Sequence, residues 1–242
     1  MRKTTTKTPV NIATRITTMA LLLLTLSTAS AQDLAAGMSM GGYNFGLSLE
    51  FQGYVNNIAS SPFGARVGFG FSFTSPFDDD DAFYGTSGAA PEADLTRISD
   101  YKERNVYDTN ERGRNFTIAL DGTYDLASFV NMDNVPFAAS IYAGPRFNSF
   151  SGSIEVNDSI ASVSATQFGL GFGSLAFYPL SDNLSVVGDI GIDIYFDPTF
   201  NLADDFGDLD VNTGDTAYDD YNSLITQPEV AARVKVGVVY SF

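Results

Sequence analysis

The chain ends in VAARVKVGVVYSF, residues 230–242. Apolar side chains occupy alternate positions of this stretch, and basic or small side chains lie between them. The apolar set is Val230, Val234, Val236, Val238, Tyr240 and Phe242, and the intervening set is Arg233, Lys235, Gly237 and Ser241. Because successive side chains of a strand point to opposite faces, this period of two predicts a strand with one apolar and one polar face.

The same period of two returns in six further stretches, and no stretch after residue 31 has the spacing of an amphipathic helix. The six stretches lie at 43–52, 66–73, 116–121, 137–146, 167–173 and 184–195. In the first of them the expected apolar face begins at Tyr43. If these strands close into a bacterial membrane barrel, the seven need an eighth, since such barrels have an even number. We expect a short strand over about 34–40 that turns back at Gly41-Gly42, a dipeptide favoured in tight hairpins.

The N-terminal segment has the three parts of a secretory signal peptide. Basic residues precede an apolar core at 19–26, and a small-residue cleavage site follows at Ala29-Ser30-Ala31. The core is too short to cross a bilayer as a helix, which needs about 20 residues. We therefore predict a cleaved signal peptide at 1–31 and one mature domain at 32–242, with an uncleaved anchor as the alternative.

The composition excludes several classes of function. The chain has 29 acidic and 13 basic residues, and loss of the leader removes four of the basic ones, which leaves a charge of about −20. Nucleic acid is therefore not an expected partner. With no His and no Cys, neither a Ser-His-Asp nor a Cys-His arrangement can form, and the usual zinc ligands and disulfides are missing. We predict that the protein is not an enzyme and has no cofactor, since a pair such as Asp189 and Asp193 is more often a salt-bridge partner than an acid-base site.

The polar faces carry charges of both signs. A soluble sandwich would expose these charges and bury the apolar faces, whereas a membrane barrel would pair them inside a narrow lumen and turn the apolar faces to lipid. Glycines on the polar side, such as Gly171, favour the lumen because they leave room for bulky charged partners. The predicted lumen network consists of Glu50, Arg66, Asp121, Asp125, Arg146, Asp189, Asp193, Arg233 and Lys235.

The last stretch is similar to the β-signal by which the barrel-assembly machinery recognises the final strand of an outer-membrane barrel. The residues that carry this resemblance are Val234, Val236, Val238, Tyr240 and the terminal Phe242. In its pattern of strands the whole mature chain also resembles the small OmpA-, OmpX- and OmpW-like barrels. It departs from many of them in having no Trp, so that Tyr and Phe must supply any interfacial aromatic girdle.

The resemblance implies an all-β fold, an eight-stranded antiparallel up-and-down transmembrane β-barrel with two long extracellular loops. It also implies export through a Sec-type signal peptide to the outer membrane of a diderm bacterium. The two expected loops, 77–113 and 197–228, are rich in acidic residues. Within the second, a set of residues is spaced loosely like a calcium-binding loop, but Gly214 stands one place later than in an EF-hand. The alternative to a solvated anionic loop is therefore a weak divalent-cation site. Its residues would be Asp208, Asp210, Asn212 and Asp215.

We expect a monomer with a closed, salt-bridged lumen and a structural or surface-interaction role. Its expected partners are outer-membrane lipid, the barrel-assembly machinery during biogenesis, and divalent cations at the acidic loops. Two alternatives stay open: a narrow pore or route for small hydrophobic molecules in the manner of OmpW, and a soluble periplasmic β-sandwich or lipocalin-like binder. Channel conductance tests the first alternative, and membrane fractionation tests the second.

Overall fold

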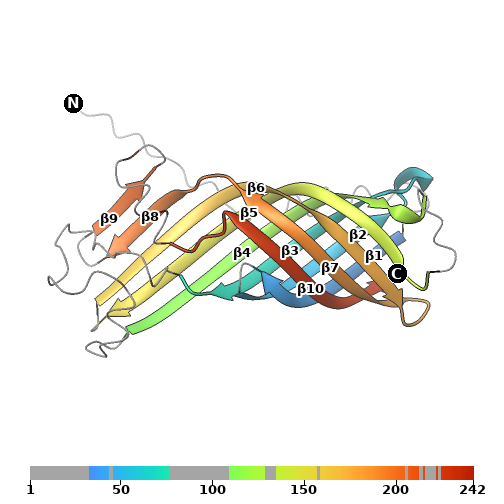
Figure 1. Ribbon diagram of the computed structural model, residues 1–242, viewed down its shortest axis with the longest axis horizontal. Helices are drawn as coiled ribbons and strands as arrows, with labels where there is room; N and C mark the ends of the chain where they lie inside the picture. Colours follow the sequence, from blue (N-terminus) through green and yellow to red (C-terminus); the bar gives the residue numbers. More distant parts are fainter. Residues whose placement is uncertain are drawn as a thin grey trace.

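The computed structural model describes residues 33–43, 46–76, 109–128, 135–156, 159–204, 207–212, 215, 222 and 225–242, and most of them lie in strands (Figure 1). The ten strands are β1 (Asp33–Tyr43), β2 (Gly46–Asn56), β3 (Phe63–Thr74), β4 (Thr109–Asp125), β5 (Ala138–Val156), β6 (Ser159–Pro179), β7 (Leu184–Tyr195), β8 (Thr199–Asp204), β9 (Gly207–Val211) and β10 (Val230–Ser241). Two short 3-10 turns, η2 (Ile58–Ser60) and η3 (Leu126–Ser128), follow β2 and β4. The expected signal peptide at 1–31 lies outside the described residues.

Eight of these strands close into a barrel. Neighbours in the sheet follow the order β5-β4-β3-β2-β1-β10-β7-β6, and pairing of β5 with β6 closes the ring. Every pairing is antiparallel, and consecutive barrel strands are neighbours. The expected eight-stranded antiparallel up-and-down barrel is confirmed.

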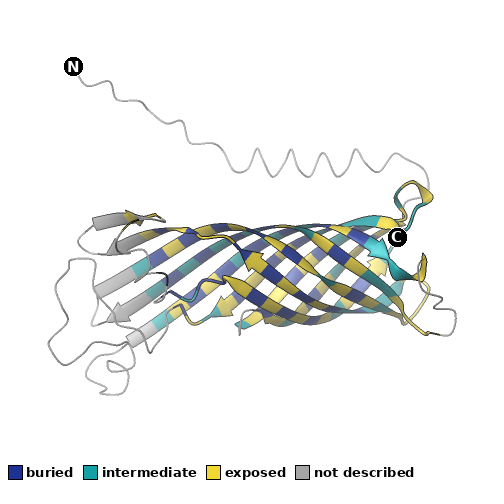
Figure 2. Ribbon diagram, turned by 45° about the horizontal axis from the view of Figure 1, so that its top comes forward, coloured by how far each residue is buried: buried dark blue, intermediate teal, exposed yellow. Residues whose placement is uncertain are grey.

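Side chains alternate between the lumen and the outside along each strand, which gives the banded pattern of Figure 2. On β10 the side chains of Arg233 and Lys235 are buried, while Val236 is 57% exposed. All ten strands belong to one sheet, and no second sheet covers the apolar side of β10 in the described part of the chain. The soluble sandwich is therefore wrong, because the apolar side chains face outward and the charged ones face inward.

The two ends of the barrel differ in their links. The links 57–62, 126–137 and 180–183 share one end with the C-terminus, which we call the turn end. β3 and β7 end, and β4 and β10 begin, at the other end, which we call the loop end (Figure 1). The strands that meet at the loop end are joined by two links of two residues, 44–45 and 157–158, and by two long ones, 75–108 and 196–229. Short inner links and long outer links are typical of outer-membrane barrels.

The first strand is longer than expected and turns at a different place. Gly41 and Gly42 lie inside β1, and the link to β2 falls at 44–45. At Gly41 a Cβ atom would overlap the carbonyl oxygen of Val234, so glycine is needed here for the close approach of β10 and not for a turn. The link also reverses the alternation, so that Tyr43, expected on the apolar face, points into the lumen and is 3% exposed.

The segment between β7 and β10, which the sequence predicts to be a loop, contains the two short strands β8 and β9. Strand β8 pairs with β6 beyond the end of β7, at 162–166, and β9 pairs with β8. Four apolar side chains toward the loop end are 3% exposed or less, and these are Phe150, Val163, Phe200 and Ile225. Among the described residues, no helix is long and apolar enough to cross a membrane.

Candidate functional site

The lumen collects eight of the nine charged residues that the sequence assigns to it. Each stands at an inward position of a strand, and each residue is 5% exposed or less. The eight are Glu50 on β2, Arg66 on β3, Asp121 on β4, Arg146 on β5, Asp189 and Asp193 on β7, and Arg233 and Lys235 on β10. Six of the eight barrel strands thus contribute charged groups to the lumen.

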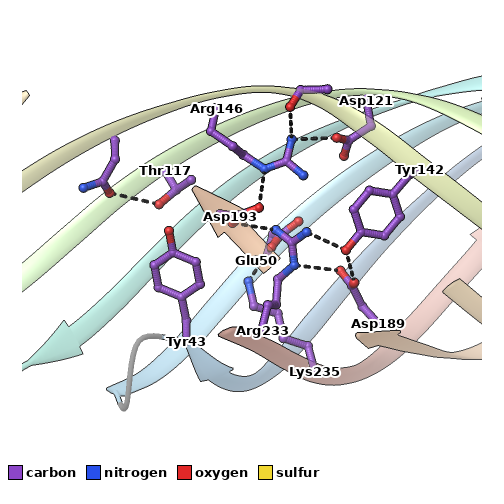
Figure 3. Close-up of polar contacts among 12 residues, drawn as sticks. Tyr43, Glu50, Thr117, Asp121, Tyr142, Arg146, Asp189, Asp193, Arg233 and Lys235 are labelled. Carbon is purple, nitrogen blue, oxygen red and sulfur yellow. Dashed lines mark hydrogen bonds and ion pairs between the residues drawn. The ribbon is translucent and has the colours of Figure 1, made fainter. Parts of the chain in front are cut away.

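Three arginines and three aspartates alternate around a closed ring of ion pairs, much of which is drawn in Figure 3. In order around this ring, which we call the charge ring, they are Arg66, Asp121, Arg146, Asp193, Arg233 and Asp189. The six N···O distances, in the same order, are 2.7, 2.6, 2.8, 3.1, 3.4 and 2.9 Å. Every member therefore contacts two groups of opposite charge.

Tyr142 fills the middle of the charge ring. Its ring centroid lies 4.0 Å from the guanidinium carbon of Arg66 and 5.3 Å from that of Arg233, within the range of cation–π attraction. Its hydroxyl donates to Asp189 at 2.7 Å and accepts from Arg233 at 2.5 Å. The sequence placed Tyr142 on the polar face but gave it no role, although its spacing of four from Arg146 puts both side chains on one side of β5.

A separate ion pair lies beside the charge ring. The ammonium group of Lys235 donates to Glu50, and Gln52 donates to the same carboxylate at 3.0 Å. Lys235 also lies 5.5 Å from the ring of Tyr43. Because Gln52 donates to Ser39 as well, at 3.1 Å, the pair is connected to β1.

Asp125 was predicted to join the network, and that prediction is wrong. The residue ends β4 at the turn end, and its carboxylate accepts from the backbone N–H of Ala127 at 2.9 Å. It therefore shapes the turn at η3. Without it the remaining eight lumen residues are four acidic and four basic ones, so their charges balance. This balance matters because an uncompensated charge in such a site is costly.

Uncharged polar groups fill the lumen between the charge ring and the loop end. Asn148 donates to Gln167 at 3.2 Å and accepts from Thr117 at 3.2 Å. Gln167 in turn donates to the carbonyl of Pro228, in the segment that leads into β10. The hydroxyls of Tyr43 and Tyr195 also meet across the lumen, 2.5 Å apart. These bonds join side chains of neighbouring strands and of strands two places apart in the barrel.

The described residues of the lumen enclose a small cavity beside the charge ring and a larger one at the turn end. On the loop side about 10 Å³ is left among residues that include Glu50 and Lys235, room for about one water molecule. At the turn end a larger space of about 220 Å³ is bounded by Asp33, Tyr54 and Asp125. The larger space is a vestibule that stops below the charge ring.

A glycine of β6 makes room for the charge ring. A Cβ atom on Gly171 would overlap both Asp193 Oδ1 and Arg146 Nε. We expect Gly171→Val to lower the free energy of unfolding by about 1–3 kcal/mol, because overpacking would displace the ion pairs. Gly188→Val on β7, where the added Cβ meets nothing within 4 Å, should change stability by less than about 0.5 kcal/mol. Urea unfolding in lipid vesicles compares the two, and equal effects would contradict a packing role for Gly171.

Of the predicted divalent-cation residues, the structure describes the side chains of Asp210, Asn212 and Asp215. Asp210 accepts from Asn201 at 2.8 Å, and Asp215 accepts from the backbone N–H of Asn212 at 2.7 Å. The side chain of Asp208 lies outside the described residues. No group of three acidic side chains suited to a metal is present among the residues that the structure describes.

The residues of the predicted assembly signal share the outward face of β10. Val234, Val236, Val238 and Tyr240 are each 46–61% exposed, and Phe242 is 80% exposed. Tyr240 and Phe242 form an edge-to-face pair with centroids 5.4 Å apart. The backbone N–H of Phe242 donates to Leu34 on β1, so the final residue stands at the seam between the first and last strands.

Comparison with known proteins places this barrel in a family. No protein-family model matches the chain, and no curated protein does. Among solved structures, a major outer membrane protein from Thermus thermophilus is 32% identical, with a TM-score of 0.74 over 88% of this chain and 100% of that one.

More distant likenesses are also found. Ail, the attachment invasion locus protein of Yersinia pestis, is 9% identical with a TM-score of 0.41 over 87% of this chain and 97% of that one. CarO2 of Acinetobacter baumannii is 14% identical with a TM-score of 0.40 over 88% and 100%. With TM-scores below 0.5, these two similarities support no further conclusion.

The Thermus protein is an outer membrane protein, and the closed barrel and apolar outer surface of this chain suit the same location. The protein lies in the outer membrane of a diderm bacterium, with the loop end outside and the turn end in the periplasm. The chain belongs to the same family of small eight-stranded outer-membrane barrels as the major outer membrane protein of Thermus thermophilus.

Proposed function

We propose that the protein is a monomeric structural barrel that holds the loop end at the cell surface and conducts neither ions nor solutes. The observation that carries this proposal is the charge ring, a closed set of six ion pairs in which Arg66–Asp189 joins β3 to β7 on the opposite side of the barrel. Both charges of each pair are shielded from water, and the ring of Tyr142 stacks against the guanidinium group of Arg66. A passing ion would have to separate buried pairs with nothing to replace them, which is unfavourable.

The packing on the loop side supports the same function. The apolar side chains of Phe150 and Val163 lie above the polar layer of Asn148 and Gln167. A solute would therefore meet an apolar layer, an amide layer and the charge ring in turn. An eight-stranded barrel has an interior just wide enough for side chains, so these layers fill the lumen.

Planar bilayer recording tests the proposal. The purified protein should give no stable open level at moderate voltage, while a general porin in the same apparatus gives discrete steps. Insertion must be shown independently, by the shift in gel mobility between heated and unheated samples. The alternative function is a narrow pore or a route for small hydrophobic molecules. A reproducible open level from the wild-type protein would overturn a sealed structural barrel in favour of this alternative.

We also propose that the barrel-assembly machinery recognises the last strand of this chain. Support comes from the outward row of β10, which ends in the exposed Phe242. Before it pairs with β1, the last strand has a free edge and alternate apolar side chains, the kind of segment that is bound by strand addition.

A further inference from the structure

The basic residues of the described barrel are divided between two places. Four of the six lie in the lumen, namely Arg66, Arg146, Arg233 and Lys235. The other two, Arg112 and Arg114, are exposed on the outer face of β4. They stand out on a protein whose full sequence has a net charge of −16.

Both arginines stand where the apolar band of β4 ends. Below Arg114 on the same face come Phe116 and Ile118, and Phe116 packs on Phe71 of β3 with ring centroids 5.1 Å apart. Beside Arg114 on β3 lies Phe73, which is 68% exposed. The two guanidinium groups thus lie at the rim of the lipid-facing surface, on the side of the loop end.

The cross-strand neighbours of the two arginines are uncharged. Arg112 is paired with Ser153 and Arg114 with Ser151, both on β5, and neither guanidinium has an ion-pair partner among the described residues. Residues two apart on one strand face are separated by about 7 Å. The pair therefore presents two guanidinium forks, flanked by serine hydroxyls, along one strand.

We propose that Arg112 and Arg114 bind the phosphate groups of anionic lipids in the outer leaflet. The charge is complementary, since a guanidinium binds phosphate through two parallel hydrogen bonds and serine hydroxyls can donate further ones. The position is also right, because the acyl chains of the same lipid would lie against Phe73 and Phe116 directly below. The surface continues the lipid contact of the barrel and anchors β4 at the level where the strand leaves the membrane.

Native mass spectrometry of the folded protein in a non-ionic detergent tests this assignment. The probes are dioleoyl phosphatidic acid and dioleoyl phosphatidylcholine, which share their acyl chains and differ in headgroup charge. We expect the first phosphatidic acid to bind the wild-type protein at least about fivefold more tightly than phosphatidylcholine, the size of effect that one basic residue gives near a lipid surface. The double variant Arg112→Gln/Arg114→Gln should bind both lipids equally.

Two further variants separate the arginines from their surroundings. Arg112→Lys/Arg114→Lys keeps the charge and should keep most of the preference. Ser164→Gln/Thr166→Gln changes the exposed polar face of β6 without a change of charge and should behave as the wild type. All variants should show normal heat-dependent gel mobility, because neither arginine contacts the lumen.

Three outcomes would overturn the proposal. They are equal binding of the two lipids by the wild type, a preference that survives in the glutamine double variant, and release of phosphatidic acid by excess inorganic phosphate. The last outcome would mean that the site recognises a free anion, since a lipid held also by its acyl chains should not be released.

Discussion

Deletion of Phe242 should lower the amount of folded protein in the outer membrane of living cells by more than about tenfold, the effect of removing a central aromatic anchor from a recognition surface. The expected defect lies in assembly. Without the terminal aromatic, the machinery would lose the anchor that identifies the last strand, and the exported chain would be degraded in the periplasm. Western blots of membrane fractions with unheated samples measure the folded form directly.

The structure predicts that the deletion lowers the amount of folded protein in cells but leaves the stability of the purified protein almost unchanged. Phe242 is 80% exposed, and its backbone N–H donates to Leu34. Its edge-to-face contact with Tyr240 is also on the surface. The shortened chain should therefore refold from urea into detergent micelles with a stability within about 1 kcal/mol of the wild type, as for most surface changes.

A matched control comes from the same end of the barrel. Phe63 begins β3 at the turn end and is 58% exposed, but it does not belong to the last strand. Phe63→Ala should reach the outer membrane in normal amounts, while Phe242→Ala should follow the deletion. Equal loss for both substitutions would point to lipid contact as the cause, and normal amounts for both would refute recognition of the terminal aromatic.

The sequence was sufficient to predict the strands of the barrel because an alternation with a period of two gives two kinds of information. It marks a strand, and it assigns each side chain to one of two faces. Asp189 and Asp193 are four residues apart on β7, so they had to share a face, and both lie in the lumen. The period alone did not decide which face meets lipid, because a soluble sandwich has the same alternation. The glycines on the polar side, such as Gly171, favoured a lumen there.

What the sequence could not supply was the position of each strand relative to its neighbours. Asp125 has the same parity as Asp121, but it lies where β4 reaches the periplasm and turns, so parity alone placed it wrongly in the network. Gly41-Gly42 has the composition of a turn, but a glycine is also required where two backbones come close. The closure of the charge ring likewise depends on the tilt and stagger of β3, β5 and β7, which no local pattern records.

Arg146→Met should lower the free energy of unfolding by about 3–5 kcal/mol, the range found when one partner of a buried ion pair is removed. Arg146 joins Asp121 and Asp193, at 2.6 and 2.8 Å, and its loss leaves the lumen with one unbalanced negative charge. Because the chain has no Trp, unfolding by urea in phospholipid vesicles is best followed by circular dichroism or by the gel-mobility shift.

Two further variants test whether the loss of charge balance causes the lower stability of Arg146→Met. Arg114→Met makes the same change on the exposed face of β4. In vesicles of phosphatidylcholine, which carries no net charge, it should alter stability by less than about 0.5 kcal/mol. Asp121→Asn/Arg146→Met restores equal numbers of acidic and basic groups in the lumen and should recover at least about 1 kcal/mol relative to Arg146→Met, since neighbouring charges are not additive. If the double variant is less stable than Arg146→Met alone, the individual hydrogen bonds of Asp121 outweigh neutrality. If Arg146→Met is as mild as Arg114→Met, the charge ring contributes little to holding the barrel closed.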